Sequence, residues 1–130
     1  MKSLLGVTAV LEAGVGLSLV ALPSQLETIL LGSSLDSAVA LTIARVAGVA
    51  LCALGLACWL ARHDGGSHAA RGLVAALVLY NAAASLILAY AGVGLELSSV
   101  ALWPTVLIHV AMAAWCVTVT RLLGKPARVS

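Results

Sequence analysis

Four stretches of this chain are long and apolar enough to cross a lipid bilayer as helices. They cover residues 4–22, 38–61, 72–92 and 99–120, and short segments rich in proline, glycine, serine and charge separate them. The hydrocarbon core of a bilayer takes roughly 20 residues of helix, whereas membrane strands alternate in segments of about ten residues, a pattern that this sequence lacks. The sequence therefore predicts an all-α fold, an integral membrane four-helix bundle that forms a single domain over residues 1–130.

The composition agrees with lipid as the main solvent of the chain. Hydrophobic residues make up 62% of it and charged residues 9%, whereas about a quarter of a soluble domain is charged. The net charge of +2 is small and scattered along the sequence, which does not favour a nucleic-acid partner. We therefore expect the lipid bilayer as the partner of most of the surface.

The distribution of lysine and arginine predicts the orientation of the helices. Lys2 precedes the first run, Arg62 and Arg71 flank the second connection, and Arg121, Lys125 and Arg128 follow the fourth run. The first and third connections contain neither residue type, so the positive-inside rule places both termini in the cytoplasm. The first run is not expected to be removed as a signal peptide, because Glu12 interrupts it and no small-residue cleavage site follows.

The first connection contains a pattern that is typical of a short helix. In "PSQLETILLG" (23–32), Ser24 is placed as an N-cap, Glu27 completes a capping box three residues later, and Gly32 provides a stop. Two interpretations stay open for this segment: a short helix lying on the outer membrane interface, or a connector that folds back on the bundle.

Each apolar run carries one strongly polar residue, namely Glu12, Arg45, Asn81 and His109. A charge inside a membrane is costly unless it is paired, so we expect these side chains to form a buried polar core. We predict a Glu12–Arg45 salt bridge, since the first two long helices are antiparallel neighbours. Arg45 extending outward to the lipid headgroups is the alternative, and Asn81 is expected to link helices by hydrogen bonds.

A face of small residues in the second run, Ala44, Gly48 and Cys52, predicts a packing surface. Small residues at this spacing let helix backbones approach closely in lipid. We therefore expect a homo-oligomer or membership of a larger membrane complex.

The sequence contains few residues in arrangements that are typical of catalytic or metal sites. His109, Met112 and Cys116 share one face of the fourth run and form a ligand set that suits copper(I) or another soft metal, although Met and Cys at this spacing are also typical of a helix core. Cys52 and Cys58 do not form a C-x-x-C motif, and no catalytic triad or phosphate-binding loop is present in the sequence. The chain is accordingly not expected to be an enzyme, and no cofactor is expected apart from this metal alternative.

A glutamate inside the first helix of a short four-helix chain resembles the small multidrug resistance transporters. The resemblance covers Glu12 and the number of helices. It implies the exchange of protons for cationic drugs at Glu12. The chain departs from that family in its strong lysine and arginine bias, in its few aromatic residues and in Arg45, which is placed to neutralise the glutamate.

Three segments together resemble small bacterial inner-membrane proteins of the DoxX-like type. They are "LEAGVGLSLVALPSQLETILLG" (11–32), "ARVAGVALCALGLACWLAR" (44–62) and "LVLYNAAASLILAYAG" (77–92). The resemblance implies a multi-pass protein of the bacterial inner membrane and carries no activity. We therefore expect a structural or accessory membrane component with a buried polar network. The alternative is a small proton-coupled transporter or channel that uses Glu12, Arg45, Asn81 and His109.

Overall fold

Five helices form the framework of the computed structural model, which describes residues 1–64 and 66–123. They are α1 (Lys2–Ala21), α2 (Pro23–Leu31), α3 (Ala38–Ala61), α4 (His68–Val93) and α5 (Leu102–Leu123). All except the short α2 are long and apolar enough to cross a membrane. The prediction of an all-α protein with four membrane-length helices is therefore confirmed for the described part of the chain. Lys125 and Arg128, on which the predicted orientation partly rests, lie outside the described residues.

Serine side chains set where the last two long helices begin. Helix α4 begins at His68, four residues before the expected start, because the Ser67 hydroxyl accepts a hydrogen bond from the Ala70 amide at 3.0 Å. Helix α5 begins at Leu102 rather than at residue 99, because the Ser99 hydroxyl accepts the Leu102 amide at 3.1 Å. Such caps satisfy amide groups that a helix leaves without a partner at its N-terminus.

The short helix α2 is present, but it does not begin with the predicted capping box. Leu22 is the N-cap and makes no side-chain cap bond, while Pro23 occupies the first turn, where its missing amide proton has no effect on the helix. Ser24 lies inside the helix, and its carbonyl accepts the Thr28 hydroxyl at 2.8 Å. Gly32 ends α2 with φ 75°, a left-handed conformation that favours glycine.

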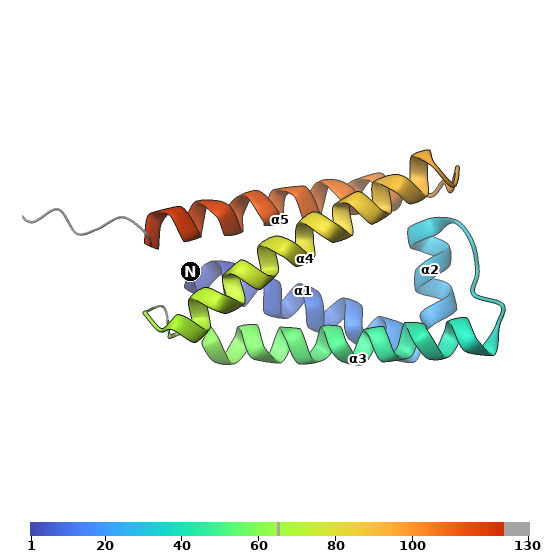
Figure 1. Cartoon of the computed structure of the whole chain (residues 1–130). Coiled ribbons are helices and arrows are strands. Elements are labelled where there is room, and N and C mark those ends of the chain that lie inside the picture. Colours follow the sequence, from blue (N-terminus) through green and yellow to red (C-terminus); the bar gives the residue numbers. More distant parts are fainter. Residues whose placement is uncertain (65, 124–130) are drawn as a thin grey trace, which may run out of the picture.

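The long helices form two pairs. Helix α1 packs along α3, and α4 packs along α5, while α2 lies across one end of the molecule between the two pairs (Figure 1). The start of α1, the α3–α4 connection and the end of α5 lie together at the opposite end (Figure 1). The Ser99 hydroxyl donates to the Leu30 carbonyl at 2.6 Å and joins α2 to the segment that precedes α5.

Glycine allows α1 and α3 to approach closely. A Cβ atom added at Gly16 would lie 2.6 Å from the Gly48 carbonyl oxygen, and one added at Gly55 would lie 2.9 Å from the Ala9 carbonyl oxygen. Small residues permit this backbone contact. Between helices in lipid, where the hydrophobic driving force is absent, such van der Waals packing stabilises the pair. In the face predicted for packing, Ala44 and Gly48 are buried and Cys52 is partly buried, and this face contacts α1 of the same chain.

The two pairs meet through a hydrophobic cluster at the end opposite α2. Its buried members come from all four long helices and are Leu4, Leu5, Ala9, Cys58, Val74, Leu77, Met112, Cys116 and Val119. The cluster uses the first half of α1 and α4, the end of α3, and α5 from its middle onward. One half of the molecule is therefore filled by close packing, and the other half, toward α2, has room for a cavity.

Substitution of Gly16 tests the contact between α1 and α3. We expect Gly16→Ala to destabilise the protein by about 1–3 kcal/mol, since overpacking against a backbone forces the helices apart. Thermal unfolding in detergent measures this loss. Gly14→Ala is the matched control, because a Cβ atom at Gly14 meets nothing within 4 Å. Equal stability of the two variants would contradict the close contact.

Candidate functional site

A cavity of about 470 Å³ lies between the two helix pairs on the side of α2. All four long helices contribute to its wall, and Leu26, Ile29 and Leu30 of α2 line it at one end. Most of the lining is apolar. The polar side chains in the wall are Glu12, Tyr80, Asn81, Thr105 and His109, so three of the four polar residues predicted from the sequence come together here.

Glu12 is the buried acid of this cavity. Its side chain is on α1 with 7% of its surface exposed, and the carboxylate accepts a hydrogen bond from the Tyr80 hydroxyl at 3.2 Å. In the part of the chain that the structure describes, no lysine or arginine lies in salt-bridge contact with it. A carboxylate with one hydrogen bond keeps acceptor positions free for a ligand or a proton.

Asn81 and His109 join α4 to α5 beside Glu12. The Asn81 amide nitrogen donates to the Leu77 carbonyl at 2.9 Å, and its amide oxygen lies 2.9 Å from Nδ1 of His109. Because an amide oxygen only accepts, Nδ1 carries the proton in this pair. The Nε2 atom of a neutral ring then keeps its lone pair free.

Tyr80 connects the two hydrogen-bonded pairs into one cluster, which we call the polar cluster and define as Glu12, Tyr80, Asn81 and His109. The rings of Tyr80 and His109 pack edge to face, with centroids 5.8 Å apart and planes at 80°. Successive residues of a helix point about 100° apart, so Tyr80 reaches α1 while Asn81 reaches α5. Sequence reasoning missed Tyr80; its phenol in the middle of an apolar run, next to Asn81, was the available signal.

Arg45 lies outside the polar cluster, and the predicted Glu12–Arg45 salt bridge is wrong. Arg45 is exposed on α3, and its Nε donates to the Val20 carbonyl at 3.4 Å near the end of α1. Val20 follows Glu12 by eight residues, which corresponds to about 12 Å along the helix. Arg45 also lines an outer groove with Thr42, so it faces away from the cavity.

The three residues of the predicted soft-metal set are divided between two environments. His109 lines the cavity and Cys116 is fully buried in the hydrophobic cluster, while Met112 lies between them and belongs to both. The histidine has Nε2 free to bind, since Asn81 holds Nδ1. A copper(I) site at these residues stays a prediction.

Comparison with known proteins identifies no relative of this chain. A scan against protein-family models, a search of curated proteins and a search of solved structures each find no match. The resemblances to the small multidrug resistance transporters and to the DoxX-like proteins therefore stay expectations from the sequence.

Replacement of Asn81 tests the link between α4 and α5. We expect Asn81→Leu to lower the free energy of unfolding by about 1 kcal/mol, because hydrogen bonds between membrane helices contribute on the order of 0.6–1.7 kcal/mol. Thermal or denaturant unfolding in detergent measures the loss. Ser85→Ala serves as the control, since the Ser85 hydroxyl is also buried but donates only to Ala82 of its own helix. A Ser85→Ala loss as large as that of Asn81→Leu would show that the Asn81–His109 bond adds no stability.

Proposed function

We propose that the protein is a small membrane protein that binds an amphipathic cation in the cavity between its helix pairs and exchanges it for a proton at Glu12. The observation that carries this proposal is a buried carboxylate that faces the cavity and has no ion-pair partner among the described residues. Binding is the core of the proposal, and proton-coupled transport is the activity that such a site would support.

The size and lining of the cavity support a small-molecule ligand. Its volume of about 470 Å³ lies within the 300–1,000 Å³ that is common for ligand sites. Such sites combine mainly apolar walls with a few convergent polar groups, and the polar cluster provides them here. An apolar ligand body would contact the leucine and isoleucine side chains while its polar group lies at Glu12.

The chemistry of Glu12 favours a cation. A carboxylate in a medium of low dielectric attracts a positive charge strongly, and a proton neutralises the same group equally well. A cation and a proton therefore compete for Glu12, which is the physical basis of exchange. A salt bridge to Arg45 would neutralise Glu12 and oppose the exchange. Arg45 lies on the outer face of α3, so this objection does not apply.

A structural role is the second candidate. The observation that favours it is the Asn81–His109 hydrogen bond, which links α4 to α5 inside the apolar region. Polar links of this kind can hold membrane helices in one arrangement without binding any ligand. Under this role, the protein would act as a homo-oligomer or as an accessory subunit of a larger membrane complex.

The proposed topology places both termini in the cytoplasm of a bacterial cell, with the chain in the inner membrane. The described lysine and arginine residues other than Arg45 lie at the end of the helices that holds the α3–α4 connection (Figure 1). The opposite end carries α2 and the acidic residues Glu27, Asp36 and Glu96. This charge asymmetry supports the assignment through the positive-inside rule. Helix α2 would then lie at the outer interface, where partial burial raises the pKa of the Glu27 carboxyl.

Substitution of Glu12 tests the exchange. We expect Glu12→Gln to weaken the binding of tetraphenylphosphonium, an apolar cation, by at least about tenfold, because the neutral amide removes the attraction that Coulomb's law gives in a low dielectric. Calorimetry of the purified protein measures binding, and a pH indicator in weak buffer measures the proton released by the unsubstituted chain. Glu27→Gln is the control, since Glu27 does not line the cavity. A Glu12→Gln variant that loses only thermal stability, with binding unchanged, would contradict the proposal and favour the structural role.

Filling the cavity tests the place of binding. Ala84 lines the cavity, and Ala53 lines the outer groove of α3. We expect Ala84→Trp to abolish the binding of tetraphenylphosphonium, because the indole occupies the space of the ligand, whereas Ala53→Trp leaves it unchanged. The same calorimetric titration compares the two variants. Unchanged binding by a folded Ala84→Trp protein would place the ligand elsewhere.

A further inference from the structure

We propose that the outer groove between α1 and α3 binds one anionic phospholipid, with an acyl chain in the groove and the phosphate at Arg62 and Lys2. This groove lies on the α1–α3 pair and does not share its lining with the cavity. The inference therefore stands apart from the cation exchange at Glu12.

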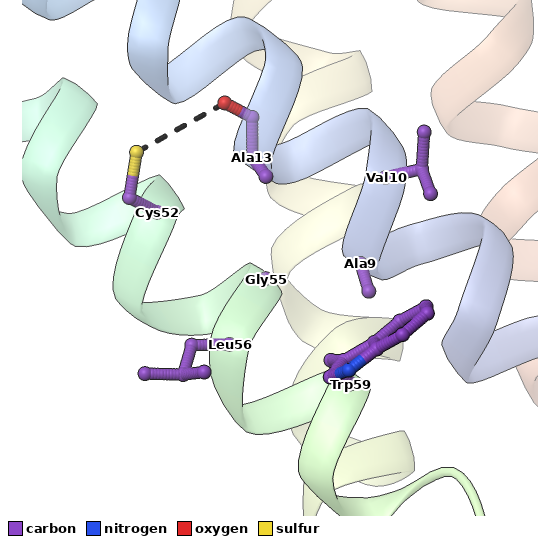
Figure 2. A pocket seen from close by; sticks show the side chains of 7 residues that line it. All are labelled: Ala9, Val10, Ala13, Cys52, Gly55, Leu56 and Trp59. Atoms are coloured by element: carbon purple, nitrogen blue, oxygen red, sulfur yellow. Dashed lines mark hydrogen bonds between the residues drawn. The ribbon is translucent and has the colours of Figure 1, made fainter.

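The groove has the shape and chemistry of a site for a hydrocarbon chain. Its volume is about 380 Å³, and Ala9 and Gly55 lie where the two helices approach each other (Figure 2). Leu56 and Trp59 belong to its α3 side. Among the described residues no charged side chain lines it, and the Cys52 thiol is directed to the Ala13 carbonyl at 3.9 Å (Figure 2). An apolar groove on the outside of a membrane helix pair offers acyl chains continuous contact.

The Arg62 guanidinium lies at the end of this groove that is nearest the C-terminus of α3. The guanidinium carbon of Arg62 lies 3.5 Å from the centroid of the Trp59 ring, and Nη1 donates to the Trp59 carbonyl. This stacking keeps the guanidinium beside the groove. Arginine has five N–H donors, and planar pairs of them match phosphate oxygens. Only Nη1 has a hydrogen-bond acceptor among the described residues, so the remaining donors can bind a headgroup.

Lys2 at the start of α1 provides a second positive charge at the same end of the groove as Arg62. The antiparallel contacts that place Gly16 beside Gly48 and Ala9 beside Gly55 bring the first turn of α1, with Lys2, to the end of α3, with Arg62. Lys2 is exposed. The two positive charges at one end of an uncharged groove favour an anionic headgroup over a zwitterionic one. Tryptophan beside them is typical of the membrane interface. In the proposed topology this end faces the cytoplasm, and cytoplasmic leaflets are rich in anionic lipids.

A second copy of this chain is the other occupant that such a groove admits. Two copies related by a twofold axis along the membrane normal would place their α1–α3 grooves face to face. The Lys2 and Arg62 side chains of both copies would then approach one another at the same end of the helices. Repulsion between these like charges disfavours that arrangement, whereas a phosphate between Arg62 and Lys2 satisfies them.

Quenching of Trp59 fluorescence by brominated lipids tests the proposal. A protein with Trp103→Phe and Trp115→Phe keeps Trp59 as its single tryptophan and is reconstituted in phosphatidylcholine vesicles. Brominated phosphatidylglycerol or brominated phosphatidylcholine is then added in equal amounts. We expect the anionic lipid to associate with the Trp59 site at least about fivefold more strongly, the ratio expected for each basic residue near a membrane surface.

The matched variants are Arg62→Gln and Arg71→Gln. Arg62→Gln should lower the lipid preference by about fivefold. Arg71→Gln should leave it unchanged, because Arg71 donates to the Gly66 carbonyl in the α3–α4 connection rather than stacking on Trp59. Equal quenching by the two lipids in the unsubstituted background would overturn the proposal. Weak quenching by both lipids together with a cross-linked dimer would also overturn it, since a second copy would then cover the groove.

Native mass spectrometry of the unaltered chain gives a measurement that needs no tryptophan replacement. After purification from a mixture of phosphatidylglycerol and phosphatidylcholine, we expect one bound phosphatidylglycerol on the natural sequence and at least about fivefold less of it on Arg62→Gln. Absence of any preference for phosphatidylglycerol on the unaltered chain would overturn the proposal, whatever the folding of the tryptophan variants.

Discussion

The close backbone contact between α1 and α3 is the constraint on which the other features depend. At Gly16, Gly48 and Gly55 the two helices are too close for a side chain at the glycine position, so the pair behaves as one wall of the molecule. The other wall, α4 with α5, then meets it through larger side chains. A tight pair facing a second pair leaves a wider gap between the pairs than within them. That difference in spacing is the physical origin of both the hydrophobic cluster and the cavity.

The two halves of the gap between the pairs are filled differently. Toward the start of α1 and the end of α5, leucine, valine and cysteine side chains close it. Toward α2, the lining includes Glu12, Asn81 and His109, and the gap stays open. Polar side chains inside a membrane protein need partners, and here they satisfy one another only in part. A partly satisfied polar cluster in an apolar cavity is the arrangement from which both the cation proposal and its structural alternative follow.

Much of the fold could be predicted because its signals are local. The sequence shows the length of each apolar run, the glycine that ends the short helix at Gly32, and the single strongly polar residue in each long run. None of these requires knowledge of a contact. The positions that were missed depend on neighbours in space. Tyr80 is important because its hydroxyl lies 3.2 Å from the Glu12 carboxylate. The error at Ser24 has a local cause instead: Pro23 suits the first turn, so α2 begins at Pro23 with Leu22 as its N-cap. The prediction of a Glu12–Arg45 pair rests on the first two long helices being antiparallel neighbours, but the rotation of α3 turns Arg45 outward.

The sequence by itself determined that this protein is all-α with four helices able to cross a membrane. In lipid every backbone amide and carbonyl must be satisfied within the segment, and a helix does this from local residues alone. Only the tertiary structure decided which polar residues meet. That choice depends on the rotation and register of each helix against its neighbours, and small residues such as Gly16 and Gly48 set these by allowing one close approach. Glu12 consequently faces Tyr80 in a cavity, and Arg45 lies on the outer surface.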